Sequence, residues 1–308
     1  MNRKICIIGG SGFLGKKYIE LTDKKSNIFV FDKKKINKKK YKIKYIKGDC
    51  LSKNTLKKIP DNIDIVIFLV GKIGGPDSLD INNLENYFEV NCQTLLNFLE
   101  SIKKNSVKKI IFFSTEHVYG NSKKKITDRF SNEQEPKNYY GITKLISEKI
   151  LKNFYNKSKI NIDILRFPRV IALDDKSLLS NLSNTILKKK FLKIDLKNIK
   201  FNFLYIDDFI RAIDCCSSKI NTGFRVLNIF NFDKPINLKK ILEIIKKNFK
   251  LKLSVQYKNN LTKLSHNPCE VIINESKYIK DTINWVPRFN NTDIIKKIYI
   301  YESKKHNQ

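Results

Sequence analysis

A tyrosine and a lysine four residues apart have the side-chain types and spacing of a proton-transfer pair. Tyr140 and Lys144 fall in a stretch with helical spacing that opens near Pro136, so both side chains are expected on one helix face. A tyrosine with its usual pKa of about 10 is a poor base, but an ammonium one turn away favours the phenolate. Tyr139 is a rival, although no lysine follows it by four residues. The pair predicts proton transfer to or from a hydroxyl group.

Hydroxyl and ionisable side chains follow an earlier run, Lys108–Phe113, which is rich in large apolar residues. The run predicts a buried strand, and Ser114, Thr115, Glu116 and His117 come directly after it. These groups are therefore expected at the carboxyl end of a strand. Glu116 and His117 are candidates for acid and base chemistry; the alternatives are a structural carboxylate and a packing histidine.

A glycine-rich loop near the N-terminus has the layout of a phosphate site. The apolar run Ile5–Ile8 precedes the pattern Gly9-x-x-Gly12-x-x-Gly15, and a helical stretch covers Phe13–Thr22. The first glycine lets the chain turn, the second lets backbone N–H groups approach a pyrophosphate, and the third lets helix and strand pack. The positive end of the helix then faces the anion.

An acidic residue at the end of the next strand extends this pattern. The run Asn27–Phe31 predicts a strand that ends at Asp32, 20 residues after Gly12, where a carboxylate would bind an adenosine ribose. Asp32 favours NAD over NADP because a 2′-phosphate would meet a like charge, although the lysines at 33–35 could neutralise it. A bound nicotinamide cation would further favour a phenolate at Tyr140.

Apolar runs and helical stretches alternate along the first half of the chain. The runs Ile43–Ile46 and Ile63–Val70 predict strands, and Leu84–Ile102 has helical spacing. Asp49 is expected to cap the helix after the first of these runs, and the glycines at 71–75 leave room for another group. The alternation predicts an α/β fold with a doubly wound parallel sheet of the Rossmann type, whose ligands lie at the carboxyl ends of the strands.

The formal net charge of +31 raises nucleic acid or an anionic membrane surface as a partner. Only seven of the 61 basic residues are Arg, and lysine triplets recur at 33–35, 38–40, 123–125 and 188–190. A binding stripe would be local and would use Arg for phosphate contacts. The charge is therefore interpreted as a chain-wide drift in composition, and specific nucleic-acid binding is not expected.

Cysteine usage and the N-terminus bear on the compartment. The six cysteines form no Cys-x-x-Cys motif, which is typical of reduced, buried thiols. No apolar run reaches 18 residues, and the four apolar residues before the first glycine are too few for a signal peptide. A cytoplasmic protein without a membrane partner is expected, and no pattern predicts a metal site.

These features together resemble the extended short-chain dehydrogenase/reductase family, in particular the NAD-dependent epimerase/dehydratase enzymes that act on nucleotide sugars. The resemblance runs through almost the whole chain and is carried by the glycine pattern at 9–15, Asp32, Gly48-Asp49, Asn91, Ser114-Thr115, Val118-Tyr119-Gly120, Pro136–Lys144, Arg166–Val170, Phe203–Asp208, Val226–Ile229 and Asn284–Pro287.

The resemblance implies roles for individual residues. Tyr140 would be the acid or base, Lys144 would hold the nicotinamide ribose, and Thr115, with Glu116, would complete the catalytic set. Arg169 and His117 would contact the substrate. The implied cofactor site consists of Gly9, Gly12, Phe13, Leu14, Gly15, Asp32, Asp49, Cys50, Leu69, Val70, Gly71, Asn91, Ser114, Tyr140, Lys144 and Phe167.

The resemblance also implies an NAD-binding Rossmann domain at 1–168, joined by a returning segment near 200–230. Residues 169–308 would form a smaller C-terminal α/β domain for a nucleotide-diphosphate sugar. A homodimer is expected, because the family often pairs through helices that here include Leu84–Ile102 and Gly141–Phe154.

Two departures from the family pattern bear on the reaction. Family 4,6-dehydratases often carry Thr-Asp-Glu where this chain has Thr115-Glu116-His117, and Arg169 replaces a sugar-side asparagine. Arg169 could clamp a diphosphate or form a loop salt bridge. The leading hypothesis is an NAD-dependent nucleotide-sugar epimerase or keto-reductase that works through a keto-sugar. The alternatives are a 4,6-dehydratase and, in another class, a non-catalytic RNA-binding or scaffold protein.

Overall fold

The computed structural model describes most of the chain. The described residues are 3–22, 27–36, 43–102, 107–120, 125–126, 134–189, 191–195, 200–252, 254–258, 272–273 and 275–307. The sixth cysteine, Cys269, lies outside them, and the five within them are free thiols. No helix in the described part of the chain is long and apolar enough to cross a membrane.

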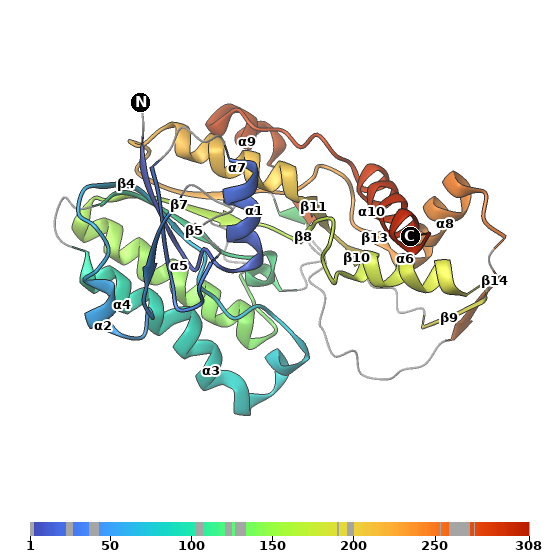
Figure 1. The fold of residues 1–308 in the computed structure, drawn as a ribbon, viewed down its shortest axis with the longest axis horizontal. Helices are drawn as coiled ribbons and strands as arrows, with labels where there is room; N and C mark the ends of the chain where they lie inside the picture. Colours follow the sequence, from blue (N-terminus) through green and yellow to red (C-terminus); the bar gives the residue numbers. More distant parts are fainter. Residues whose placement is uncertain are drawn as a thin grey trace.

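A seven-stranded parallel sheet forms the centre of the fold (Figure 1). Its order, β12-β7-β5-β4-β1-β2-β3, reverses direction at β1, which is the pattern of a doubly wound sheet. The predictions of an α/β class and of strands at the apolar runs are therefore confirmed. The strands are β1 (Lys4–Ile8), β2 (Asn27–Asp32), β3 (Ile43–Lys47), β4 (Ile63–Phe68), β5 (Val107–Phe113), β7 (Asn161–Arg166) and β12 (Phe224–Asn228).

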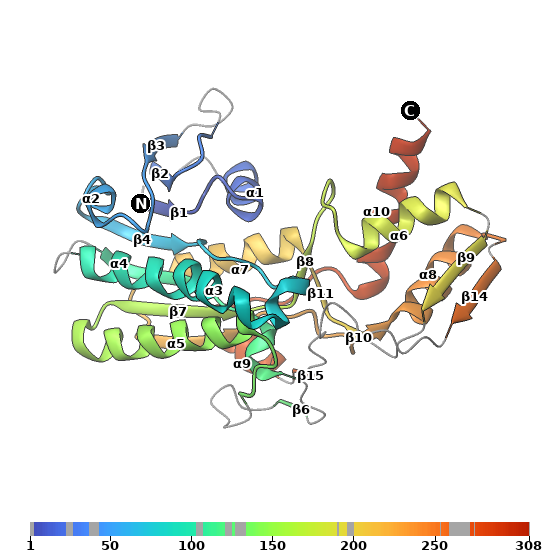
Figure 2. The ribbon, with the colours of Figure 1, turned by 90° about the horizontal axis from the view of Figure 1, so that it is seen from below.

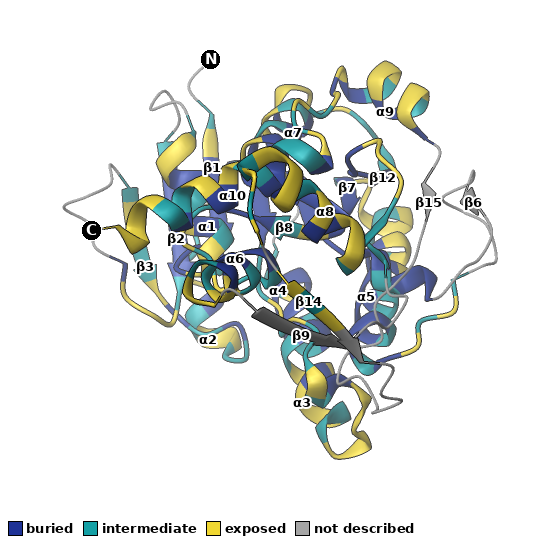
Figure 3. Ribbon diagram, turned by 90° about the vertical axis from the view of Figure 1, so that its right-hand side faces the viewer, coloured by how far each residue is buried: buried dark blue, intermediate teal, exposed yellow. Residues whose placement is uncertain are grey.

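Successive residues of the central strands alternate between two hydrophobic cores. In β4, Ile65 and Ile67 belong to one core and Val66 and Phe68 to the other. Both cores are closed by helices, which is why these strands carry apolar residues on both faces instead of alternating with polar ones. The strands form the buried interior of the sheet region in Figure 3.

Two helical layers cover the sheet. On one face α1 (Phe13–Leu21) packs against α7 (Ile206–Ser218), which contacts α9 (Ser276–Ile283). On the other face α4 (Thr94–Ser101) and α5 (Tyr139–Ser158) lie side by side (Figures 1 and 2). The chain thus returns to the sheet through α7 and β12 after it has left the first run of βα units.

The predicted helix over Leu84–Ile102 has a wide turn in its middle. It is built from α3 (Leu84–Phe88), a π-helical turn η3 (Glu89–Gln93) and α4. A π-helical turn carries an extra residue and often marks a functional position. Asn91 lies in it and is fully buried.

The helix after β3 is short and starts later than expected. Ser52 is the N-cap residue of α2 (Lys53–Leu56), so the prediction that Asp49 caps this helix is wrong. The Asp49 side chain instead accepts a hydrogen bond from the Leu51 backbone at 3.0 Å, which closes a local turn before the helix begins.

A second group of elements lies beside the carboxyl edge of the sheet (Figure 2). Three helices pack together there: α6 (Leu178–Lys188), α8 (Leu238–Phe249) and α10 (Asn291–His306). The short strand pairs of this group are β8 (Arg169–Ile171) with β11 (Phe203–Tyr205), β10 (Lys200–Phe201) with β13 (Ile236–Asn237), and β9 (Phe191–Asp195) with β14 (Ser254–Lys258). A fourth pair, β6 (Lys125–Ile126) with β15 (Ile272–Ile273), lies outside this group in Figure 2.

Asp208 joins two segments that are distant in sequence. Its buried carboxylate accepts hydrogen bonds from the backbone N–H groups of Arg288 and Phe289 at 2.9 and 3.0 Å. The indole N–H of Trp285 donates to the Asp208 carbonyl at 3.0 Å. Asp208 therefore contributes to the fold, because it fixes the chain between α9 and α10.

Candidate active site

A cavity of about 810 Å³ opens at the carboxyl ends of β1, β4, β5 and β7. Its walls come from the glycine loop at 9–15, the loop at 71–75, the residues after β5 and β7, and the segment Lys200–Asn202. Segments that are far apart in the sequence, from Gly9 to Asn202, therefore meet at one site. This is the edge at which open α/β sheets bind ligands.

The glycine loop fits the phosphates of a dinucleotide. Gly9 has a φ of +81°, and a Cβ at Gly15 would stand 2.5 Å from the Gly10 carbonyl oxygen. A Cβ at Gly12 would meet only the Gly9 oxygen at 3.4 Å, so this position faces open space. Gly12 is also the N-cap of α1 and provides no side-chain cap. The first N–H groups of the helix are thus available to an anion at the cavity wall.

Five of the predicted cofactor residues do not line this cavity. They are Asp32, Asp49, Cys50, Val70 and Asn91. The Asp32 carboxylate accepts a hydrogen bond from the Ser11 backbone at 2.9 Å, so it braces the glycine loop from behind. Lys33 lies 3.6 Å from the Asp49 carboxylate and is paired there. Val70 packs on Gly9, and the Cys50 carbonyl accepts a hydrogen bond from Asn97.

Asn91 holds the loop after β4 against α5. Its Oδ1 atom accepts a hydrogen bond from the Lys72 backbone at 2.7 Å, and its Nδ2 atom donates to the Thr143 hydroxyl at 2.9 Å. Tyr87 adds a second anchor, because its hydroxyl group contacts the Ile73 carbonyl and the Asp77 carboxylate. The loop at 71–75 is therefore held by hydrogen bonds at both Lys72 and Ile73.

Two glycines of this loop lie directly on the candidate catalytic pair. A Cβ at Gly71 would stand 3.2 Å from the Lys144 Nζ atom, and one at Gly74 would stand 2.8 Å from Tyr140 Cδ1. The glycines at 71–75 were expected to leave room for another group, and that group is the pair Tyr140 and Lys144. The cavity is also lined by Gly74 and Gly75, which were expected to leave room for another group, and by Lys72, Ile73 and Ser78, for which no role was predicted. The glycine-rich run at 71–75 is the sequence signal that could have identified this part of the site.

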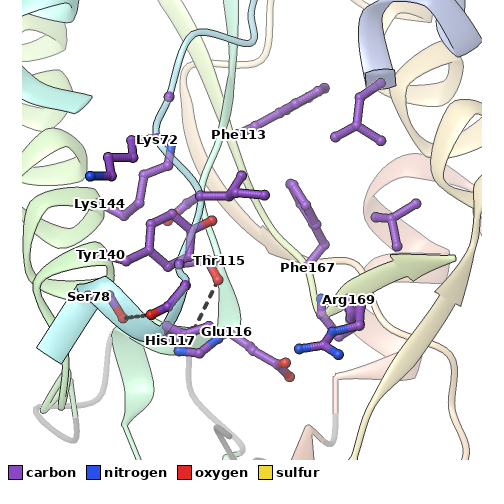
Figure 4. A pocket seen from close by; sticks show the side chains of 18 of the residues that line it. Lys72, Ser78, Phe113, Thr115, Glu116, His117, Tyr140, Lys144, Phe167 and Arg169 are labelled. Atoms are coloured by element: carbon purple, nitrogen blue, oxygen red, sulfur yellow. Dashed lines mark hydrogen bonds between the residues drawn. The ribbon is translucent and has the colours of Figure 1, made fainter. Parts of the chain in front are cut away.

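Tyr140 and Thr115 lie side by side in the cavity (Figure 4). Burial raises the pKa of Tyr140 to about 12; a hydrogen bond with Thr115 lowers the pKa, and the nearby Glu116 raises it. The protein's own groups thus act against the expected phenolate. Burial also lowers the pKa of Lys144, to about 8, and its ammonium group lies over the Phe112 ring, 4.6 Å from the ring centroid. A further positive charge is needed to ionise Tyr140 near neutral pH.

Glu116 is a buried carboxyl group on the far side of Thr115. Its Oε2 atom accepts a hydrogen bond from Asn202 at 3.0 Å, and its side chain turns toward Arg169 (Figure 4). Burial raises its pKa to about 8, although Asn202 and Arg169 both lower it. The raised pKa favours the protonated carboxyl group near neutral pH, so the group can donate a proton. Asn202 was missed because nothing in its local sequence marks it.

His117 is half-buried at the cavity wall. Its ring meets the Tyr140 ring edge-on with centroids 5.5 Å apart, and its Nδ1 atom lies 3.0 Å from Asn138 Nδ2. Asn138 was not among the predicted site residues. As the residue directly before α5, its identity as a strong N-cap type is the signal that could have found it.

Ser114 and Phe167 reach the cavity in different ways. The Ser114 hydroxyl donates to Glu148 at 2.5 Å, and Glu148 pairs with Arg166, so this hydroxyl serves a buried network behind the site. Ser114 also borders the cavity. Phe167 lines the cavity and packs edge-on against Phe113 and Phe209. Phe13, Leu14 and Leu69 also border the cavity.

The doubly wound sheet, the uncapped glycine turn and the Tyr140–Lys144 pair define a Rossmann-type enzyme of the short-chain dehydrogenase/reductase class. Residues 5–229 match the model of the NAD dependent epimerase/dehydratase family. Because the match covers more than half of the chain, the protein belongs to this family.

Curated relatives are similar at low identity. The N-acetyl-alpha-D-glucosaminyl-diphospho-ditrans,octacis-undecaprenol 4-epimerase of Escherichia coli O157:H7 is 26% identical over 82% of this chain and 74% of its own length. The dTDP-D-glucose 4,6-dehydratase of Dictyostelium discoideum is 29% identical over 77% of this chain and 62% of its own length.

Solved structures share the fold. The UDP-glucuronic acid 4-epimerase of Bacillus cereus, solved with UDP-glucuronic acid and NAD, has a TM-score of 0.82 at 21% identity and covers 98% of this chain and 99% of that one. MoeE5, solved with UDP-glucose and NAD, has a TM-score of 0.81 at 18% identity with the same coverage.

Proposed function

We propose that the protein is an NAD-dependent nucleotide-sugar epimerase or keto-reductase. The observation that carries the proposal is the placement of the Tyr140 phenol beside Thr115, in the cavity that the uncapped glycine turn also borders. A proton-transfer group and a phosphate cradle in one cavity are what oxidation of a sugar hydroxyl requires.

The catalytic steps proposed for this chain concern one proton. Thr115 binds the reacting sugar hydroxyl, and Tyr140 takes its proton as the carbon becomes a ketone and returns it when the ketone is reduced. Bound NAD would supply the acceptor, and then the donor, of the hydride on that carbon. Lys144, held beneath Gly71 next to Asn91, binds the nicotinamide ribose and supplies positive charge below Tyr140.

The proposed cofactor site uses both faces of the glycine turn. The N–H groups at the start of α1 bind the pyrophosphate, and Phe167 borders the nicotinamide end of the cavity. The Asp32 carboxylate, which already braces Ser11, binds the adenosine ribose. NAD is preferred to NADP because Lys33 is paired with Asp49, where it does not offset the charge of Asp32.

The proposed substrate is a nucleotide-diphosphate sugar. Support comes from the substrates in the names of the relatives and from the cations Arg169 and Lys200, which also line the cavity. A diphosphate would find a planar guanidinium at Arg169, which is suited to bidentate contacts. The substrate would be bound mainly by residues 169–308, and the cofactor by residues 1–168.

A 4,6-dehydratase is the second candidate. Glu116 favours it, because a carboxyl group that is protonated near pH 7 can donate a proton to a departing hydroxyl. Elimination also needs a base for a carbon-bound proton, and the candidate for that base is His117, which lines the cavity.

Product masses distinguish these reactions. The protein is incubated with NAD and UDP-, GDP-, CDP- and dTDP-sugars, and products are analysed by mass and chromatographic mobility. An unchanged mass with altered mobility supports an epimerase, a two-hydrogen change supports a reductase, and loss of water supports the dehydratase. Turnover of none of them, together with saturable, sequence-selective RNA binding at physiological salt, would support the non-catalytic alternative.

We also propose a homodimer through α3, α4 and α5. The segment Ile73–Ile102 contains no Lys or Arg, although the chain has a net charge of +31. Leu79, Ile81 and Phe88 within it are exposed by 43%, 60% and 39%. An apolar surface that lacks the lysines found elsewhere is suited to a second copy. Light scattering should give twice the chain mass, and Phe88→Lys should give monomers; a monomeric wild type would contradict the proposal.

A further inference from the structure

Asn138 connects the first turn of α5 to the ring of His117. Its Oδ1 atom accepts a hydrogen bond from the Gly141 backbone at 2.8 Å, and its Nδ2 atom lies 3.0 Å from His117 Nδ1. The same side chain therefore caps the helix that carries Tyr140 and contacts the histidine at the cavity wall.

The orientation of the Asn138 amide is decided by Gly141. A backbone N–H can only donate, so the amide atom that faces it must be the oxygen. The atom that faces His117 is then the NH₂ group, which can only donate. His117 Nδ1 must accept, and a neutral imidazole that accepts at Nδ1 carries its proton on Nε2.

The ring has little freedom to leave this arrangement. A Cβ at Gly141 would stand 2.6 Å from the His117 carbonyl oxygen, so the first turn of α5 packs directly on the His117 backbone. The backbone N–H of His117 also donates a hydrogen bond to the Thr115 hydroxyl at 3.3 Å, and the His117 ring meets the Tyr140 ring edge-on. The position of the imidazole is thus coupled to both Tyr140 and Thr115.

We propose that Asn138 is a positioning residue that fixes His117 as its Nε2–H tautomer, and that His117 acts as a hydrogen-bond donor to a sugar oxygen. The tautomer follows from the chain's own contacts, whereas the sugar as partner rests on the proposed function. A neutral ring that accepts from Asn138 at Nδ1 and is protonated at Nε2 has no lone pair left to act as a base. His117 therefore contributes to substrate specificity, and the geometry favours the epimerase or reductase over the dehydratase.

The tautomer can be measured without substrate. The chain has three histidines, His117, His266 and His306, so a ¹⁵N-histidine-labelled sample gives few resonances, and His117→Gln identifies the relevant set. Long-range ¹H–¹⁵N correlation at neutral pH is expected to show His117 with unprotonated Nδ1 and protonated Nε2. A ring protonated at Nδ1 would overturn the proposal.

Two variants of Asn138 keep the helix cap and alter only the contact with the ring. In Asn138→Asp the second carboxylate oxygen accepts, so His117 is expected to carry a proton on Nδ1. In Asn138→Ser the cap is kept and the contact is lost, so both tautomers are expected. An unchanged Nε2–H pattern in Asn138→Asp would contradict a positioning role for Asn138.

The donor role is tested on whichever nucleotide sugar is turned over. His117→Gln keeps an N–H donor and His117→Phe does not, so His117→Phe is expected to lose about tenfold in kcat/KM relative to His117→Gln. If both variants lose kcat equally and also lose one limb of the pH profile, His117 is a base and the donor role is wrong. If no sugar is turned over, the proposed function fails while the tautomer is still decided by the NMR measurement.

Discussion

Gly74 lies against the face of Tyr140, so closely that a Cβ at Gly74 would stand 2.8 Å from Tyr140 Cδ1. The loop after β4 is thereby part of the wall that positions the phenol. Asn91 and Tyr87 anchor this loop from behind, so it cannot move away without loss of these hydrogen bonds.

Gly74→Ala is therefore expected to lower kcat by roughly tenfold or more, because a small displacement of Tyr140 from the substrate hydroxyl is costly. The fold should be kept, as shown by an unchanged circular dichroism spectrum. Leu21→Ala, which truncates an exposed side chain at the end of α1, serves as the control. Equal activity of Gly74→Ala and wild type would show that the loop does not position Tyr140.

Tyr140→Phe is expected to lower kcat by about 100-fold or more, because the variant lacks the hydroxyl that carries the proton. Tyr139→Phe provides a matched control at the adjacent position and should stay within about twofold of wild type. Both are measured on the sugar identified from the substrate panel, together with NAD binding by calorimetry. Loss of activity in Tyr139→Phe alone would reverse the assignment.

Glu116 should make stability fall as pH rises. Its pKa in the folded protein, about 8, lies above its usual value, so its favourable contribution is complete at low pH and is lost as pH rises through about 8. The residue that replaces Glu116 in Glu116→Gln cannot ionise. The Tm of this variant should therefore fall less than the Tm of wild type between pH 5 and 9, by roughly 5 °C. Parallel curves for the two proteins would mean that Glu116 ionises normally.

Asn91→Ala should destabilise the protein by about 1–3 kcal/mol, because it leaves the Lys72 N–H without its partner and opens a gap beside Thr143. Turnover should fall as well, since the loop over Lys144 loses its anchor. Denaturant unfolding measures the first effect and steady-state kinetics the second. Asn86→Ala, at an exposed position on α3, should change neither.

Apolar runs in the first half of the sequence were sufficient to predict five of the seven strands of the sheet, β1 to β5, but not β7 and β12. The runs Ile5–Ile8 and Ile63–Val70 predicted strands that the structure contains, because β-branched residues buried on both faces leave a continuous apolar signal. The helix over Leu84–Ile102 was predicted as one piece, whereas its π-helical turn was not. In that turn Asn91 forms hydrogen bonds with the distant Lys72 and Thr143, and local spacing does not encode such contacts.

The sequence predicted which residues lie at the site better than it predicted how those residues ionise. Tyr140, Lys144, Thr115 and Glu116 line the cavity as a set, but the electrostatics of Tyr140 differ from the expectation. A pKa depends on burial and on which charges come close, and spacing along one helix fixes neither.

The sequence by itself determined the chemistry available: a glycine turn that can cradle phosphate, a tyrosine and a lysine on one helix face, and a hydroxyl at the end of a buried strand. Only the tertiary structure decided how these groups behave. Packing of the Gly71–Gly75 loop on the catalytic pair, the pairing of Glu116 with Asn202, and the contact of Asn138 with His117 all join residues far apart in the chain. Proton positions follow from such contacts, because a hydrogen-bond partner and the loss of water at a buried site decide which form of a group is favoured.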